Sequence, residues 1–209
     1  MLAAVDFMNA LSDRHGEVVQ KKISNASIAI AGLGGLGSNI AVSLARCGVG
    51  HLLLVDFDKV DLHNINRQQY FYDQIGMYKT DAIKDILKRI NPYIKIDTKC
   101  VNIDSENAAD IFGCFRIVCE AFDKPENKAM LVNELLQKTN ATVVAGSGMA
   151  GYLSSNSIVT KKVMQRLYLC GDGETDIDDV NGLMAPRVAI CANHQANMVI
   201  RLICGEMDV

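Results

Sequence analysis

The sequence lacks the features that mark several classes of protein. No apolar run approaches the roughly 18 residues of a membrane-spanning helix, so we expect no membrane insertion. The formal net charge is only −3 and there is no basic tail, which argues against a nucleic-acid-binding surface. The sequence opens on the apolar residues 1–5 without a basic residue among them, and Asp6 follows at once. We therefore expect no signal peptide and a cytoplasmic protein.

Paired cysteines, internal repeats and interdomain linkers are also missing. The seven cysteines, at positions 47, 100, 114, 119, 170, 191 and 204, form no C-x-x-C motif, and several fall in apolar patterns. This usage is typical of reduced thiols that act as small buried hydrophobic residues. We therefore expect no zinc site. With 209 residues, 49% of them hydrophobic, the chain is predicted to form a single domain, residues 1–209, with a substantial core.

What the sequence does contain is a glycine-rich turn between an apolar run and a helical pattern. The motif G-x-G-x-x-G has its glycines at Gly32, Gly34 and Gly37. The first two permit a tight turn and let the backbone approach a polyphosphate, while Gly37 lets the new helix lie close to its strand. The N–H groups of that helix are then free to bind an anion. This order predicts a phosphate-binding βαβ unit.

A second apolar run follows the helix and ends at Asp56, 19 residues after Gly37. Asp56 is placed to accept hydrogen bonds from a ribose, but the motif alone does not separate NAD from ATP. Beyond it, Asp58, Asn64 and Arg67 bring an acid, an amide and a cation into the crevice outside the strand ends. A dehydrogenase needs little there beyond ribose recognition. An enzyme that cuts between the α- and β-phosphates needs fixed donors, and Arg supplies a permanently charged fork of them.

Further motifs make the pattern more specific. They are GLGGLG at 32–37, VDFD at 55–58, N-x-x-R-Q at 64–68, IGMYK at 75–79, VCEAFDK at 118–124 and a closing helix at 186–202. Together they resemble the ThiF/MoeB/HesA family, the bacterial relatives of ubiquitin-activating enzymes. Residues 64–71 and 148–152 most resemble a compact ThiF-type subgroup. Many family members carry two C-x-x-C pairs that bind zinc, and this sequence departs from them.

The resemblance implies an adenylyltransferase that uses ATP and Mg²⁺. Its substrate would be the C-terminal glycine carboxylate of a ubiquitin-fold sulfur carrier, a ThiS-like protein of thiamine thiazole synthesis, and the enzyme would be a homodimer. A molybdopterin-type (MoaD-like) carrier is the nearest alternative. A NAD-dependent Rossmann oxidoreductase, a nucleotide-binding scaffold without turnover and an enzyme acting on an RNA-borne carboxylate also stay open.

The resemblance also assigns roles to individual residues. The implied catalytic residues are Arg67, Lys79, Asp123 and Arg14, with Asp123 also the Mg²⁺ ligand. The implied nucleotide-binding residues are Gly32, Gly34, Gly35, Gly37, Asp56, Asp58, Asn64, Arg67, Gln68 and Lys79.

Each role has an ordinary structural alternative. Arg67 could be a surface loop residue, Asn64 could close its own turn, and Lys79 could be solvated. Asp123 could instead cap the helix that starts near Pro125. Arg14 is expected to reach the partner's ATP across the dimer, or else to pair with an exposed acid such as Asp13.

Three further features are interpreted from their surroundings. Cys170 lies where some relatives carry an attacking thiol, but acidic neighbours would raise its pKa, so a structural role is favoured. His194 falls within an apolar helix and is expected to be a hydrogen-bonded core residue. The small residues 146–151 could either form a narrow mouth for the carrier's tail or link two parts of the chain.

Alternating patterns predict an α/β fold with a doubly wound, mainly parallel Rossmann-like sheet. The expected strands are 27–32, 51–56, 94–101, 116–121 and 142–145, and the expected helices are 17–23, 38–47, 80–90, 106–112 and 125–137. This core covers about residues 24–150. In residues 151–209 we expect antiparallel strands at 157–163 and 167–170, an acidic loop at 172–179 and a final helix.

Overall fold

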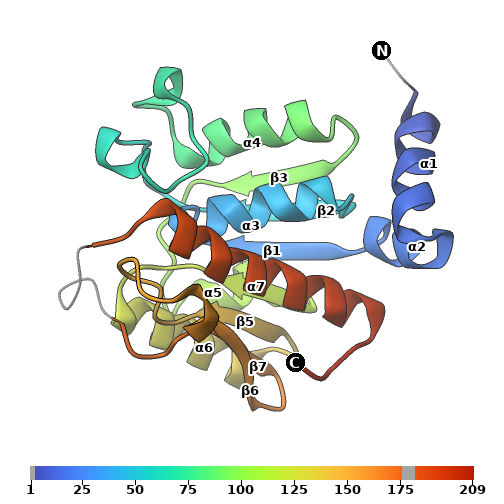
Figure 1. Cartoon of the computed structure of the whole chain (residues 1–209). Coiled ribbons are helices and arrows are strands. Elements are labelled where there is room, and N and C mark those ends of the chain that lie inside the picture. Colours follow the sequence, from blue (N-terminus) through green and yellow to red (C-terminus); the bar gives the residue numbers. More distant parts are fainter. Residues whose placement is uncertain (1–2, 176–181) are drawn as a thin grey trace.

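One sheet organises the computed structural model, which describes residues 3–175 and 182–209 (Figure 1). Its strands in these ranges are β1 (Ser27–Ala31), β2 (His51–Val55), β3 (Lys95–Lys99), β4 (Ile117–Glu120), β5 (Thr142–Gly146), β6 (Val159–Met164) and β7 (Leu167–Gly171). They lie in the order β3-β2-β1-β4-β5-β7-β6. Every neighbouring pair is parallel except β6 and β7, so the prediction of a doubly wound, mainly parallel sheet is confirmed.

Helices cover both faces of the sheet. The α-helices are α1 (Ala4–His15), α2 (Glu17–Ser24), α3 (Gly35–Arg46), α4 (Lys79–Ile90), α5 (Ala108–Phe112), α6 (Pro125–Lys138) and α7 (Ala185–Cys204), and the short 3₁₀ helices are η1 (Leu62–Asn64), η2 (Tyr72–Gln74) and η3 (Ser155–Ser157). Successive side chains of a strand point to opposite faces, and β1 follows this rule. Its Ile28 and Ile30 join the core under α3, α4 and α7, whereas Ala29 and Ala31 join the core under α5 and α6.

Three details differ from the sequence-based expectations. Helix α3 begins at Gly35 rather than at residue 38, because close packing tolerates glycine within the first turn despite its poor helix propensity. Strands β6 and β7 are antiparallel to each other, as expected, but β7 also pairs in parallel with β5, a pairing that the expectation did not include. Helix α1 was not expected. None of its residues is buried, so its sequence carries little of the periodic apolar pattern by which a core-facing helix is recognised.

Some expectations fall on residues outside the described ranges. Of the acidic loop expected at 172–179, only residues 172–175 are described. Within the described ranges, no helix has the length and apolar character that crossing a lipid bilayer requires.

The strand order places a crevice at one edge of the sheet. From β1 the chain proceeds outward to β2 and β3, and it then returns to β4 on the other side of β1. At such a reversal the loops after the two central strands diverge, and ligands of open α/β sheets bind between them. The loops after β1, β2, β4 and β5 therefore border the crevice in which a ligand would bind.

Candidate functional site

A cavity of about 490 Å³ lies beyond the carboxyl ends of β1, β2, β4 and β5. Its size is in the range of small-molecule sites. All of the residues predicted to act in the site line it, except Gly37 and Arg14. The cavity is also lined by Lys128, which the sequence analysis did not single out, and by residues 146–150 of the glycine-rich segment.

The glycine turn after β1 has the close packing expected of its glycines. Gly32 has φ +88°, and a Cβ there would lie 2.8 Å from the carbonyl oxygen of Ala121. A Cβ on Gly37 would lie 1.9 Å from the carbonyl oxygen of Gly32, so the prediction that Gly37 brings the helix close to its strand is confirmed. Helix α3 starts at the cavity with Gly34 as its N-cap and with no side-chain cap. This arrangement suits an anion at the helix N-terminus.

Two side chains hold this turn in place. The carboxylate of Asp56 accepts hydrogen bonds from the backbone N–H of Leu33 (2.6 Å) and of Asp58 (2.8 Å). The hydroxyl of Tyr70 donates to the carbonyl oxygen of Leu33 (2.7 Å). Burial raises the pKa of Asp56, and the charge of Lys79 opposes that rise. A carboxylate has about four acceptor positions, so Asp56 can hold the turn and still accept from a ribose.

Lys79 is held at the cavity by an ion pair. Its Nζ lies 2.7 Å from Oδ2 of Asp58, and only 7% of the Lys79 side chain is exposed. The alternative that Lys79 is a solvated surface residue is therefore wrong. As the first residue of α4, Lys79 is a cation at a helix N-terminus, which is unfavourable for the helix dipole. Asp58 compensates that charge, and a phosphate could do the same.

Arg67 and Gln68 line the cavity, and each also has one buried polar atom without a partner. The Nη1 of Arg67 donates to the carbonyl oxygen of His63 (3.1 Å) and to Oδ1 of Asn66 (2.8 Å). Among the described residues, however, Nε of Arg67 and Oε1 of Gln68 are buried without a hydrogen-bond partner. Buried polar atoms are usually paired in native proteins. Four described atoms away from the cavity share this state, so what distinguishes these two is that their residues line the cavity.

The electrostatics around Arg67 also suit a phosphate. Burial lowers the pKa of the Arg67 guanidinium, and the nearby Asp123 carboxylate opposes that shift. An arginine stays charged in proteins even so. The alternative that Arg67 is a solvated loop residue does not hold, because the side chain is half-buried and lines the cavity.

The loop that carries Arg67 is positioned by α3. The Nδ2 of Asn39 donates to the carbonyl oxygens of Gly35 (2.7 Å) and Arg67 (3.2 Å), and its Oδ1 accepts from Nε2 of Gln69 (2.6 Å). The backbone carbonyl of Asn64 accepts from the N–H of Gln68 (3.0 Å), and this hydrogen bond closes the turn that carries Arg67. Asn39 was missed in the sequence, although a buried amide on an otherwise apolar helix face was a usable signal.

The end of β4 contributes an exposed carboxylate and a buried ion pair. Asp123 is exposed and lines the cavity; the N-cap of α6 is Lys124, so the alternative that Asp123 caps this helix is wrong. Glu120 is fully buried, accepts from the N–H of Phe122 (2.6 Å) and pairs with Lys128 (3.0 Å). Lys128 also donates to the carbonyl oxygen of Gly146 (2.9 Å), which ties the ends of β4 and β5 together.

Arg14 does not join this cluster. It is exposed in the last turn of α1, which leads through α2 to the start of β1, at the opposite end of the sheet from the cavity (Figure 1). Its action across a dimer stays a prediction.

Cys170 and His194 have structural surroundings. Cys170 is buried, and burial raises the pKa of its thiol to about 11, so a packing role fits better than nucleophilic attack. His194 is half-buried, and its Nδ1 lies 3.0 Å from Oγ1 of Thr160. All seven cysteines are unpaired. In the part of the chain that the structure describes, no three His, Cys, Asp or Glu side chains gather as a metal site requires; the absence of zinc stays a prediction.

Comparison with known proteins identifies relatives of the whole arrangement. The model of the ThiF family matches residues 8–209. The adenylyltransferase and sulfurtransferase MOCS3 of Caenorhabditis briggsae is 36% identical over 140 residues, which are 66% of this chain and 35% of that protein. Ubiquitin-like modifier-activating enzyme 5 of Oryza sativa subsp. japonica is 45% identical over 92 residues, 44% of this chain and 22% of that protein. The chain thus spans about a third or less of these relatives.

Solved structures share the fold over nearly the full chain. Escherichia coli tRNA N6-threonylcarbamoyladenosine dehydratase, TcdA, in complex with ATP has a TM-score of 0.86 at 19% identity and covers 99% of this chain and 98% of its own. E. coli MccB with ATP has a TM-score of 0.72 at 26% identity and covers 91% of this chain and 59% of its own.

Proposed function

The chain belongs to the ThiF family, and from that premise we propose that it adenylates the C-terminal glycine carboxylate of a ubiquitin-fold sulfur carrier. We propose a ThiS-like carrier of thiamine thiazole synthesis, with a MoaD-like carrier as the nearest alternative. The relatives named as adenylyltransferases and as a modifier-activating enzyme support this class of substrate. Sulfur from a separate donor would then attack the acyl carbon of the adenylate, and AMP would leave as the bond to its phosphate oxygen breaks.

The observation that carries the proposal is that one cavity gathers the glycine turn, the cations Arg67 and Lys79, and the carboxylate of Asp123. Nε of Arg67 is a charged donor and Oε1 of Gln68 is an acceptor, and both are buried beside the glycine turn. ATP presents phosphate oxygens that accept and ribose hydroxyl and adenine amino groups that donate. Bound ATP would therefore offer partners of both kinds. ATP is present in the TcdA and MccB structures that share this fold.

The proposed reaction is an in-line displacement at the α-phosphorus. A carboxylate oxygen of the carrier forms a bond to that phosphorus while the bond to the β-phosphate oxygen breaks, and pyrophosphate leaves with the electron pair. The carboxylate is already ionised and needs no general base, so positioning and charge neutralisation account for catalysis. Arg67 and Lys79 are the cations at the cavity that would neutralise the phosphates, together with the N–H groups of the glycine turn.

Mg²⁺ suits the residues present. It is usually held by one or two carboxylates together with substrate phosphates, and Asp123 is an exposed carboxylate at the cavity. The positive charge of the Mg²⁺ ion would offset the negative charge of the leaving pyrophosphate. We propose a homodimer in which Arg14 of one copy approaches the site of the other, because within one chain Arg14 lies at the far end of the sheet.

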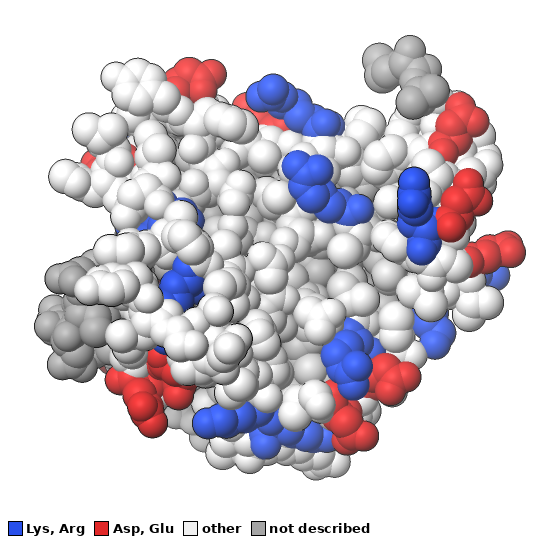
Figure 2. Space-filling view, in the orientation of Figure 1, with Lys and Arg blue, Asp and Glu red and all other residues white. Residues whose placement is uncertain are grey.

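A protein carrier is favoured over an RNA-borne carboxylate. On the face shown in Figure 2, basic side chains are interspersed with acidic ones instead of forming one basic patch, and the net charge is −3. A phosphate backbone is bound mainly through clusters of Lys and Arg.

A NAD-dependent activity is less well supported. Hydride transfer develops no charge on the phosphates, so it would leave Arg67 and Lys79 at the cavity without a catalytic role.

Carrier-dependent exchange between ATP and labelled pyrophosphate tests the proposal. The panel would hold a ThiS-like protein, a MoaD-like protein and tRNA, with each carrier also tested without its terminal glycine as the matched control. We expect exchange only with an intact carrier, and most rapidly with the ThiS-like one. Tight ATP binding without exchange on any acceptor would instead indicate a scaffold, and preferential binding of NADH would indicate an oxidoreductase.

A further inference from the structure

The glycine-rich segment 147–151 contributes its residues 147–150 to one wall of the cavity, and a neighbouring loop contacts this segment. The N–H of Gly173 donates to the carbonyl oxygen of Ser147 (3.0 Å), and the N–H of Asp172 donates to that of Gly148 (2.9 Å). The N–H of Ala150 donates to Oγ1 of Thr175 (3.2 Å). Residues 147–150 have no helix or strand of their own. The segment is held at its ends by the carbonyl oxygens of Cys170 and Gly182, which accept from the N–H groups of Ser147 (2.8 Å) and Gly151 (2.7 Å), and between them by residues 172–175.

Asp172 organises this loop. Its Oδ1 accepts from the N–H groups of Glu174 (2.9 Å) and Thr175 (3.0 Å), and its Oδ2 accepts from Oγ1 of Thr175 (2.9 Å). Burial would raise the pKa of Asp172, but the hydrogen bonds from Thr175, Glu174 and Arg187 hold it below its ordinary value. The carboxylate also lies directly against the wall, because a Cβ on Gly148 would come within 2.0 Å of Oδ1.

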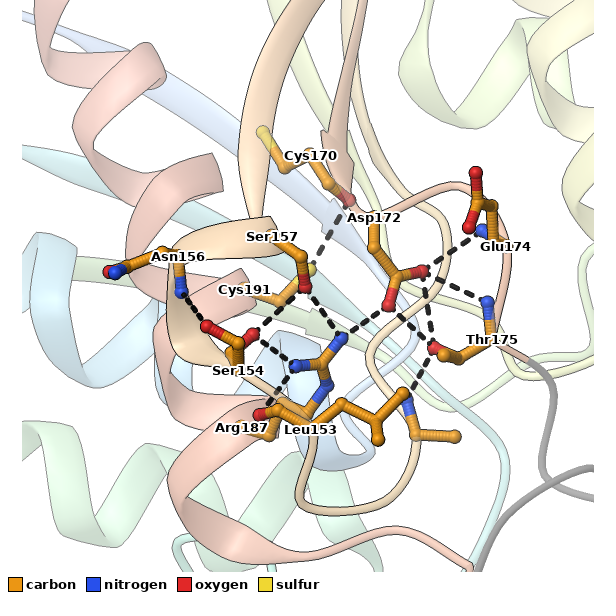
Figure 3. Close-up of polar contacts among 11 residues, drawn as sticks. Leu153, Ser154, Asn156, Ser157, Cys170, Asp172, Glu174, Thr175, Arg187 and Cys191 are labelled. Carbon is orange, nitrogen blue, oxygen red and sulfur yellow. Dashed lines mark hydrogen bonds and ion pairs between the residues drawn. The ribbon is translucent and has the colours of Figure 1, made fainter.

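Arg187 connects Asp172 to a third segment (Figure 3). It is 3% exposed and lies in the first turn of α7. Its Nη1 donates to the carbonyl oxygens of Leu153 (2.9 Å) and Ser154 (2.6 Å), and its Nη2 donates to Oγ of Ser157 (3.2 Å) and forms an ion pair with Oδ2 of Asp172. One guanidinium thus joins the segments 153–157 and 172–175 to the start of α7.

A charge in this place is unfavourable unless something compensates it. A cation opposes the helix dipole at an N-terminus, and a buried cation must be paired. Asp172 provides the opposite charge, and the planar guanidinium fixes the direction of its hydrogen bonds. Neither Arg187 nor Asp172 lines the cavity, so neither is placed to touch a substrate.

Resting on the carrier adenylation proposed above, we propose that Arg187 and Asp172 are positioning residues that hold the segment 147–151 in the shape that receives the carrier's extended C-terminal tail. An extended glycine tail offers backbone groups and almost no side chains, so its binding depends on a wall with backbone partners already in place. Without the ion pair, three irregular segments would lose their common anchor, and ordering them would oppose tail binding.

The test compares three variants of this pair. Asp172→Asn keeps an oxygen for the N–H groups of Glu174 and Thr175 but removes the charge. Arg187→Lys keeps the charge but loses the fork of donors. The double variant Arg187→Met/Asp172→Asn removes both charges, so no unpaired buried charge is left to unfold the protein.

Arg166 offers a matched control. It also donates to three carbonyl oxygens, those of Leu136 (2.7 Å), Ala141 (2.8 Å) and Thr139 (2.9 Å). It lies just before β7, at the opposite end of the sheet from the cavity. Arg166→Met therefore removes a comparable set of contacts without touching the wall.

The measurements are the KM for the carrier and kcat in pyrophosphate exchange, the Kd for ATP, and the urea midpoint. In the double variant we expect the carrier KM to rise by about tenfold or more, with the ATP Kd within about twofold of wild type. Arg187→Lys should give a smaller rise, and Arg166→Met should lower the urea midpoint but leave the carrier KM unchanged.

Two results would overturn the positioning role. One is an unchanged carrier KM in a folded double variant; the other is an equal rise in Arg166→Met, which would reduce the pair to a stabilising contact. Absence of exchange by the wild-type protein with every carrier would refute the adenylation proposal itself, so the two failures are distinguishable.

Discussion

The motif glycines have different tasks in this structure, and single alanine substitutions should separate them. In Gly37→Ala the new Cβ would lie 1.9 Å from the carbonyl oxygen of Gly32, whereas an ordinary contact begins at 3.4 Å, so the start of α3 would have to retreat by about 1.5 Å. The obstacle is backbone, which cannot rotate away. Gly34→Ala is the matched variant in the same turn, because its nearest neighbour would be Nε2 of Gln68 at 3.8 Å.

The expected results follow from these distances. Overpacking a core typically costs 1–3 kcal/mol, and a backbone clash lies at the upper end, so we expect Gly37→Ala to lower the free energy of unfolding by about 3 kcal/mol or more. Gly34→Ala should change it by less than about 1 kcal/mol. It should nevertheless weaken ATP binding, since Gly34 lines the cavity where the phosphates are proposed to lie.

Urea denaturation and ATP titration by calorimetry measure the two quantities independently. The reasoning would be refuted by a Gly37→Ala variant as stable as wild type, since the packing described for α3 would then be incorrect. A Gly34→Ala variant with unchanged ATP affinity would move the phosphates away from the turn.

Four further outcomes are expected. Arg67→Ala should lower the exchange rate by about 10²-fold or more with the fold intact, because Arg67 would neutralise developing charge; a rate within twofold of wild type would exclude it from catalysis. Asp123→Asn should raise the Mg²⁺ concentration needed for half-maximal exchange, and elemental analysis should find no stoichiometric zinc; one zinc per chain would contradict the second expectation. Burial raises the pKa of Glu120, and the charge of Lys128 opposes that rise. The contribution of Glu120 to the free energy of unfolding is therefore fully present below its unfolded pKa of about 4.3. It is lost as the pH rises through the higher pKa of the folded state. The unfolding free energy of wild type relative to Glu120→Gln should therefore fall as pH is raised from about 4, and a rise would contradict the assigned direction.

The sequence predicted those parts of the fold that depend on local pattern. Strand–helix alternation and the glycine turn were sufficient to predict a doubly wound, mainly parallel core, because each βαβ unit is specified by neighbouring residues. The order of the strands in the sheet was not predicted. The antiparallel pairing of β6 with β7 was predicted, but the pairing of β7 with β5 was not, since a short apolar run does not specify its second neighbour. Helix α1 was missed because none of its residues is buried.

The candidate site shows the same division. The residues that line the cavity follow strand ends, and motifs at strand ends can be found in the sequence. The residues that hold them could not be found this way, because Asn39 with Gln69 and Glu120 with Lys128 are partners only after folding. Their signal in the sequence is no more than a polar residue in an apolar context.

The ion pair between Lys79 and Asp58 has a consequence for selectivity among anions. With its Nζ 2.7 Å from a carboxylate oxygen, the lysine is already neutralised before any nucleotide arrives. A small anion such as inorganic phosphate or sulfate must compete with that carboxylate and has few other contacts to offset the exchange. In the proposed mode of binding, a nucleoside triphosphate would also contact the glycine turn and Asp56, and these contacts would offset the loss of the ion pair with Asp58. We therefore expect the ion pair to weaken the binding of inorganic anions more than that of a nucleoside triphosphate.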